Sequence, residues 1–171
     1  MKQDAVIAIK CQEEMKSNEY YMSLALKEAK KAYINGDVPV GCVIVVNDQV
    51  IAKAYNTRQN KKDTIGHAEI NAIKKACKKL NAWILEDAII YVTLEPCLMC
   101  AGAILNARIK KLVYATEEPK FGSIESVATV LDNEKFNHKV IIEKGVLKEE
   151  SSNLLKTFFK ELRNKKNNWQ I

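Results

Sequence analysis

The sequence contains no long apolar run, no internal repeat and no low-complexity tract. No stretch approaches the roughly 20 consecutive apolar residues that a membrane-spanning helix needs. The first 16 residues, MKQDAVIAIKCQEEMK, hold an apolar run of only five residues between Asp4 and Lys10, which is too short for the core of a secretory signal peptide. These absences argue against an integral membrane protein and predict a cytoplasmic protein with no membrane partner.

Histidine is scarce and cysteine is sparse, with two histidines and five cysteines in 171 residues. In a reducing compartment five cysteines do not indicate a disulfide framework. We therefore interpret the cysteines as thiols or metal ligands.

Lysine, by contrast, is abundant, and the formal net charge is +6. A basic surface can bind polyanions such as nucleic acids. A coding sequence rich in A and T also produces many lysine and asparagine codons, so the charge alone leaves both explanations open.

Helical and strand patterns alternate along the chain. Helical patterns cover residues 19–35, 66–80, 97–109 and 151–168. Strand patterns cover residues 39–46, 49–56, 88–94, 110–116 and 138–144. The pair Asn47–Asp48 predicts a hairpin turn between the first two strands, and residues 57–65 are expected to form a loop. This order predicts an α/β fold in which helices cover both faces of a mixed sheet.

The length predicts one domain. We expect an N-terminal extension over residues 1–16, followed by a single domain over residues 17–171. Its last helix is basic and amphipathic, with apolar residues on one side.

The segment TLEPCLMC carries two cysteines at the start of a predicted helix. Cys97 and Cys100 are three positions apart, so both sulfur atoms can point to one side of the first turn. A helix N-terminus favours the thiolate, which is the form that binds metal. Taken alone, this pair fits a redox dithiol, half of a structural zinc site or part of a catalytic metal site.

His67 also lies at a predicted helix start, thirty positions before Cys97. One histidine and two cysteines form a ligand set well suited to Zn²⁺. Structural zinc has four protein ligands, whereas catalytic zinc has three and an open position. The other cysteines and the second histidine are interpreted as core or surface residues: Cys11, Cys42, Cys77 and His138. The sequence therefore predicts an open, catalytic site with one Zn²⁺ per chain.

Glu69 follows His67 by two positions, in GHAEI, and faces a different side of the helix. A carboxylate there can accept a proton from a water molecule at the metal and pass it on. On its own, Glu69 would be interpreted as a first-turn acid that stabilises the helix dipole. Beside His67 and the two cysteines it completes the pattern H-x-E…P-C-x-x-C, which is typical of zinc nucleobase deaminases. A redox dithiol would leave His67 and Glu69 unexplained.

Over residues 19–163 the chain resembles the bacterial tRNA-specific adenosine deaminases of the cytidine deaminase superfamily. The resemblance lies in the segments GDVPVGCVIV, AYN, GHAEI, YVTLEPCLMCAGAI, ARIKKLVYA, PKFGS, NHKVII and FFKELR. It implies a three-layer α/β/α fold with a five-stranded mixed sheet, and a homodimer. It also implies hydrolysis of adenosine to inosine at wobble position 34 of a tRNA anticodon stem-loop, with an arginine tRNA as the expected substrate.

The resemblance assigns roles to five residues. His67, Cys97 and Cys100 match the zinc ligands, and Glu69 matches the proton shuttle. Asn56 matches a residue that contacts the flipped-out nucleoside, although an asparagine after a strand is also a common turn residue.

The chain departs from the family pattern at Gly66, where alanine is usual, and in TEEPKFGS, which is more acidic through Glu117 and Glu118. Phe158 or Phe159 could stack on a base. Eight basic residues are candidates for phosphate contacts: Lys61, Lys62, Lys110, Lys111, Lys120, Arg163, Lys165 and Lys166. Two alternatives remain: a deaminase of guanine, cytosine or deoxycytidylate, and a non-catalytic subunit stabilised by zinc.

Overall fold

The computed structural model describes residues 16–167. Its strands form one sheet in the order β2-β1-β3-β4-β5. Their bounds are β1 Gly41–Val46, β2 Gln49–Tyr55, β3 Ile89–Leu94, β4 Lys111–Thr116 and β5 Ile141–Lys144. Strand β1 runs antiparallel to β2 and β3, while β3, β4 and β5 are parallel. The mixed five-stranded sheet is therefore confirmed.

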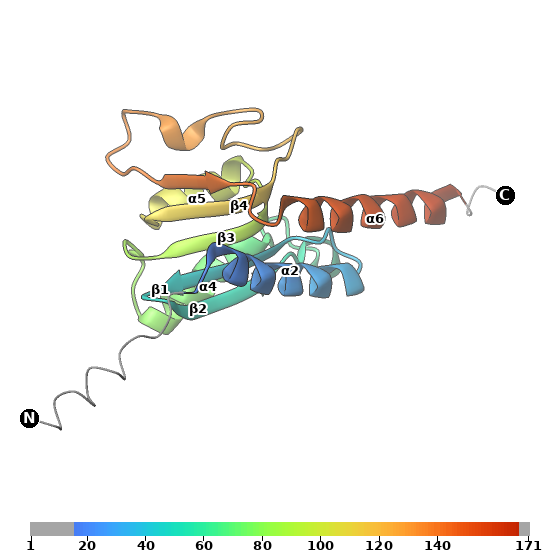
Figure 1. Ribbon diagram of the computed structural model, residues 1–171, viewed down its shortest axis with the longest axis horizontal. Helices are drawn as coiled ribbons and strands as arrows, with labels where there is room; N and C mark the ends of the chain where they lie inside the picture. Colours follow the sequence, from blue (N-terminus) through green and yellow to red (C-terminus); the bar gives the residue numbers. More distant parts are fainter. Residues whose placement is uncertain (1–15, 168–171) are drawn as a thin grey trace, which may run out of the picture.

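Helices cover both faces of the sheet (Figure 1). Their bounds are α2 Asn18–Ile34, α3 Arg58–Lys61, α4 Ala68–Leu80, α5 Leu98–Asn106 and α6 Lys148–Asn167, with a short 3₁₀ helix, η2, at Val130–Asp132. The predicted extension over 1–16, apart from Lys16, lies outside the described residues, as do Cys11 and the last four positions of the chain.

Alternation along β1 separates the two apolar cores. Cys42 and Ile44 pack with α4 and α5 on one face, whereas Val43 and Val45 pack with α2 on the other. Successive strand residues point to opposite faces, so a continuous apolar strand such as GCVIVV is expected where both faces are covered. The three-layer α/β/α arrangement follows from this burial.

Helix α6 lies beside α2 on the same face of the sheet (Figure 1). The Phe158 ring contacts the Tyr33 ring edge-on, with the ring centroids 5.5 Å apart. Near the start of α6, the Ser151 hydroxyl donates a hydrogen bond of 2.5 Å to the carbonyl of Thr93 in β3. These contacts fix the basic C-terminal helix to the domain.

The predicted hairpin is present, and its turn has the expected geometry. Asn47 and Asp48 have φ values of 48° and 58°, the left-handed pair that a two-residue type I′ turn requires. Asparagine and aspartate tolerate this conformation better than most residues. The ND dipeptide was therefore a reliable signal.

Several predicted boundaries were wrong. Helix α5 ends at Asn106 rather than at residue 109, because Arg108 adopts a left-handed backbone with φ of 55°. Residues 57–65, predicted as loop, contain α3, whose first amides donate to the buried Asp37 carboxylate at 2.5 and 3.1 Å. That contact spans more than 20 residues, so no local pattern indicates it.

Gly41 marks the closest approach of α2 to the sheet. A Cβ atom at this position would lie 1.9 Å from the Ala25 carbonyl oxygen and 2.4 Å from the Ala29 nitrogen. Both are backbone atoms of α2 and cannot rotate away. We expect Gly41→Ala to lower the free energy of unfolding by about 3 kcal/mol, since the helix must shift. Urea denaturation measures the change.

The matched control is Gly102→Ala in α5, where an added Cβ meets no atom within 4 Å. Alanine favours a helix over glycine, so the free energy of unfolding should rise slightly. Equal stabilities of the two variants would contradict the packing of α2 on Gly41.

Candidate metal centre

Two helix starts meet at one end of the sheet. His67 is the N-cap of α4, and Cys97, three residues after the end of β3, is the N-cap of α5. Pro96 precedes Cys97, and Cys100 lies one turn into α5. Because two helix N-termini carry partial positive charge, they favour thiolate and carboxylate groups between them.

The structure brings the three predicted ligands together. His67 Nδ1 lies 3.6 Å from Cys97 Sγ and 3.5 Å from Cys100 Sγ. A tetrahedral ion with the usual Zn–N and Zn–S bond lengths separates nitrogen and sulfur by about 3.6 Å. Within residues 16–167, these residues form a group whose ligand atoms all lie within 4.8 Å of one another and could hold a metal ion. The donor set and its spacing therefore fit a metal site.

Hydrogen bonding sets the protonation of this cluster. The Cys100 thiol donates to Cys97, and this bond, with help from His67, lowers the pKa of Cys97 to about 4. The same bond, together with burial, raises the pKa of Cys100. The hydrogen bond with Cys97 raises the pKa of His67, although burial opposes it. The cluster thus favours a thiolate at Cys97, the form that binds metal.

Glu69 lies against this cluster, in the first turn of α4. Its side chain is buried, and burial raises its pKa. His67, Cys97 and Cys100 all lie close enough to influence that pKa. A buried carboxyl group facing three candidate ligands is suited to proton transfer at the metal.

Asn56 follows β2 directly and is buried. Its side-chain amide donates to the Val38 carbonyl at 3.1 Å, and its side-chain oxygen accepts from the Arg58 N–H at 3.2 Å. These two bonds join the DVPVG segment to α3. The Asn56 side chain thus stabilises the turn after β2. Its contact with a nucleoside stays a prediction.

Asn71 fixes the turn before His67. Its amide donates to the carbonyls of Tyr55 and Gly66 at 3.1 and 3.3 Å. Gly66 is buried, and an added Cβ there would lie 3.1 Å from Thr57 Oγ1. A side chain at position 66 would therefore be crowded by Thr57, and glycine avoids this contact. Sequence reasoning gave Asn71 no role, and its placement one turn after His67 was the available signal.

The candidates for a fourth ligand lie elsewhere. Cys42 is fully buried in β1, and Cys77 packs against the same core from α4. His138 is half-buried rather than a free surface residue, because its Nε2 lies 2.9 Å from the Ile109 carbonyl oxygen. None of these three joins the cluster, which keeps three protein ligands among the described residues.

A loop over residues 117–126, called the 117–126 loop below, borders the cluster. Gly122 pairs with Cys97 in an isolated antiparallel bridge, and the Ser123 N–H donates to the Pro96 carbonyl at 2.9 Å. The loop therefore lies against a candidate metal ligand.

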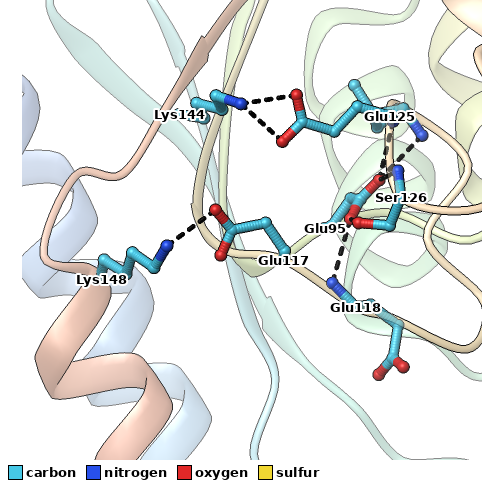
Figure 2. Close-up of polar contacts among 8 residues, drawn as sticks. Glu95, Glu117, Glu118, Glu125, Ser126, Lys144 and Lys148 are labelled. Carbon is cyan, nitrogen blue, oxygen red and sulfur yellow. Dashed lines mark hydrogen bonds and ion pairs between the residues drawn. The ribbon is translucent and has the colours of Figure 1, made fainter.

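Two of the acidic side chains in this loop are paired with lysines (Figure 2). Glu117 lies 2.8 Å from Lys148 in α6, and Glu125 lies 2.6 Å from Lys144 in β5. Of the two glutamates that depart from the family pattern, Glu117 is thus neutralised by a lysine of α6.

The basic residues predicted to contact phosphates differ in their exposure to solvent. Lys111 is half-buried and forms an ion pair of 2.7 Å with Glu143. Six others are exposed: Lys61, Lys62, Lys110, Lys120, Arg163 and Lys165. The Lys166 side chain lies outside the described part. Phe158 is buried and Phe159 is exposed, so Phe159 is the one available for stacking.

Across residues 16–167, none of the helices combines the length and the apolar composition needed to cross a bilayer.

Comparison with protein families and named relatives gives consistent results. The family model of MafB19-like deaminases matches residues 16–163. A tRNA-specific adenosine deaminase of Bacillus subtilis (strain 168) is 47% identical over 152 residues, which cover 89% of this chain and 94% of the relative. One of Aquifex aeolicus (strain VF5) is 47% identical over 146 residues, covering 85% and 96%.

Solved structures agree with this result. One, from a study of A-to-I editing by tRNA:A34 deaminases at the wobble position of transfer RNA, superimposes with a TM-score of 0.77 at 40% identity. It covers 80% of this chain and 99% of its own. A guanine deaminase from Nitrosomonas europaea superimposes with a TM-score of 0.69 at 19% identity, covering 89% and 91%. That second likeness supports the fold alone.

Proposed function

Because the chain belongs to the family of tRNA-specific adenosine deaminases, we propose that it converts adenosine to inosine at wobble position 34 of a tRNA anticodon, with an arginine tRNA as substrate. The observation that carries this proposal is the meeting of His67, Cys97 and Cys100 beside the buried Glu69. This arrangement occurs in a chain with 47% identity to named members of the family.

The proposed cofactor is one Zn²⁺ per chain, held by His67, Cys97 and Cys100. Nitrogen and sulfur donors at about 3.5 Å from one another suit zinc better than hard cations, which prefer oxygen ligands. When bound, such an ion supplies the Lewis acidity that makes water a nucleophile near neutral pH.

The proposed role of Glu69 is to move protons. The reaction adds water at C6 of adenine and breaks the bond between C6 and the amino nitrogen, giving inosine and ammonia. Glu69 accepts a proton from the attacking water, delivers it to ring nitrogen N1, and passes a second proton to the departing amino group. Its place in the first turn of α4, two residues after His67 and close to the three candidate ligands, supports this role.

The proposed substrate is an anticodon stem-loop. A wobble base is already unpaired, so flipping it into a pocket costs less than opening a duplex. The exposed lysines and the net charge of +6 supply the attraction for phosphates.

The test is incubation with an anticodon stem-loop that carries adenosine at position 34, followed by nuclease digestion and mass spectrometry for inosine. A second stem-loop, with the adenosine moved to a neighbouring loop position, should remain unchanged. Free adenosine, guanine, cytosine and deoxycytidylate are offered separately. Turnover of guanine or a pyrimidine in place of the RNA would support the alternative deaminase, and bound zinc without any turnover would support the non-catalytic subunit.

Affinity for the stem-loop should fall steeply with salt. With about four phosphate contacts to single-stranded RNA, the dissociation constant should rise about 50-fold between roughly 50 and 200 mM salt. Fluorescence anisotropy with a labelled stem-loop measures it.

A matched pair of variants tests which lysines matter. Removing the exposed charges of Arg163 and Lys165 with glutamine should flatten the salt dependence. Lys111→Gln should leave it unchanged, because Lys111 is paired with Glu143. A binding curve that does not respond to salt would contradict the phosphate contacts.

The homodimer and the cytoplasmic location are also proposals. Trp83 is 68% exposed and lines an open apolar pocket with Ile70 and Ile73 of α4 and Ala103 of α5. Exposed apolar groups that gather in this way favour an interface. Light scattering should report a particle mass of twice 19.3 kDa.

A further inference from the structure

Glu95 forms an unusually dense set of hydrogen bonds for a single carboxylate. It lies between the end of β3 and Pro96, and its side chain is 2% exposed. Its oxygens accept five hydrogen bonds, all from the 117–126 loop (Figure 2). Oε1 accepts from the N–H groups of Ile124, Glu125 and Ser126 at 3.1, 2.9 and 3.0 Å, and Oε2 accepts from the Glu118 N–H at 3.0 Å and from the Ser126 hydroxyl.

These bonds hold the loop at two separate places. Its first part is held at Glu118, through Oε2. Its last part, residues 124–126, is held by three N–H groups on Oε1 and by the Ser126 hydroxyl on Oε2. A carboxylate buried in this way needs such donors, because a buried charge without partners is strongly unfavourable. The position of Glu95 and the path of the loop therefore determine each other.

Gly122 is an independent observation at the same contact. A Cβ atom on Gly122 would lie 2.3 Å from Glu95 Oε2 and 2.5 Å from the Glu118 carbonyl oxygen. The loop can close on Glu95 only because this position has no side chain. Gly122 also pairs with Cys97, so the closed loop lies on a candidate metal ligand.

The loop presents two side chains to solvent immediately before Gly122. Phe121 is 71% exposed, and Lys120 is exposed beside it. An aromatic ring next to a cation is the combination that proteins use to stack on an unpaired base and to contact its phosphate. The ion pairs of Glu117 and Glu125 with lysines are exposed, and such pairs contribute little to stability. The buried contact with Glu95 is therefore the one that sets the loop.

We propose that Glu95 is a positioning residue for the deamination of RNA: it holds the 117–126 loop against Cys97, so that Phe121 and Lys120 receive the nucleotides beside the target base. This inference rests on the proposed function, since it assumes an RNA substrate. Glu95 acts through the loop and touches neither the reacting atoms nor the metal.

The principal variant is Glu95→Gln, which keeps the shape of the side chain. Its amide oxygen, in the place of Oε1, can still accept from residues 124–126. Its amide NH₂, in the place of Oε2, faces the Glu118 N–H, which is also a donor, whereas the Ser126 hydroxyl can rotate and accept from that NH₂. The variant therefore releases the first part of the loop selectively. Gly122→Ala reaches the same contact from the other side, by displacing the Glu95 carboxylate, and Gly102→Ala is the matched control.

We expect Glu95→Gln and Gly122→Ala to lower kcat/KM for the stem-loop about tenfold to a hundredfold, mainly through KM. That is the loss associated with one stacked base. Phe121→Ala should show the same change. Zinc should remain at one per chain, and Gly102→Ala should match the wild type. The double variant Glu95→Gln/Gly122→Ala should lose no more than the worse single variant, because both break one contact.

Hydrogen exchange gives a second measurement, independent of activity. In Glu95→Gln the Glu118 amide should exchange faster, while the amides of residues 124–126 keep their protection. A merely structural role predicts a different result: zinc content and folded fraction fall together, and kcat/KM per zinc-loaded molecule stays at the wild-type value. That result, or additive losses in the double variant, would overturn the inference. An inactive wild type would instead refute the proposed function, and the exchange pattern would still decide whether Glu95 holds the loop.

Discussion

Replacing Glu69 with glutamine should lower the single-turnover rate on the stem-loop by about 10²-fold to 10⁴-fold, the range that a general acid–base contributes. Glutamine keeps the size of the side chain, which is 4% exposed, but it cannot accept a proton from water. Zinc should stay bound, because the three candidate ligands are unchanged. The rate is measured with excess enzyme, and zinc by elemental analysis. Glu69→Ala should show the same loss of turnover with zinc retained.

Glu28→Gln is the matched control for this variant. Glu28 is also a buried glutamate in a helix, but it lies in α2 on the other face of the sheet and pairs with Lys31 at 2.6 Å. Its replacement should leave the rate on the stem-loop unchanged. If Glu69→Gln kept a rate within tenfold of the wild type, proton transfer would have to be assigned to another group.

Removal of a ligand should have an effect of similar size on turnover and an additional effect on stability. Cys100→Ser should lose most of the zinc and all measurable turnover, because serine is a poor zinc ligand and Cys100 is fully buried in the cluster. The melting temperature should fall as well, since an ion bound only to the folded chain stabilises it. Elemental analysis, the inosine assay and calorimetry measure the three effects.

The matched control is Cys77→Ser, because Cys77 is a partly buried cysteine in α4 that lies outside the cluster. It should keep its zinc and its turnover. On the wild type, a chelator should abolish activity, and added Zn²⁺ should restore it. Activity that survives complete removal of metal would exclude the zinc mechanism, and recovery with a different ion alone would identify another metal.

The parts of the site that the sequence predicted are those that depend on local spacing. Cys97 and Cys100 are one turn apart at a helix start, and His67 begins another helix, so their side chains are directed by rules that operate within a few residues. The same holds for the Asn47–Asp48 turn. Only the proximity of the two helix starts depends on the tertiary fold and could not be predicted from local spacing.

The parts that were missed depend on bonds between distant segments. Asp37 binds the first amides of α3 across 22 and 23 residues, and Glu95 binds amides 23 to 31 residues away. Backbone N–H groups are present at every residue except proline, so they leave no pattern in the sequence that indicates their partner. The available signal at Glu95 was a glutamate directly after the apolar strand β3. A glutamate is rarely buried unless its carboxylate has hydrogen-bond or charge partners.

The way in which Glu95 binds the 117–126 loop has a consequence for how this enzyme can diversify. Four of the five hydrogen bonds come from backbone N–H groups, and Ser126 alone contributes a side chain. The path of the loop is thus largely independent of the side chains at positions 119–121. If Lys120 and Phe121 contact the RNA as proposed, single substitutions at these positions should change substrate preference while the backbone path of the loop stays constant. Residues 119–121 are therefore the first place to randomise when selecting variants that edit other RNAs.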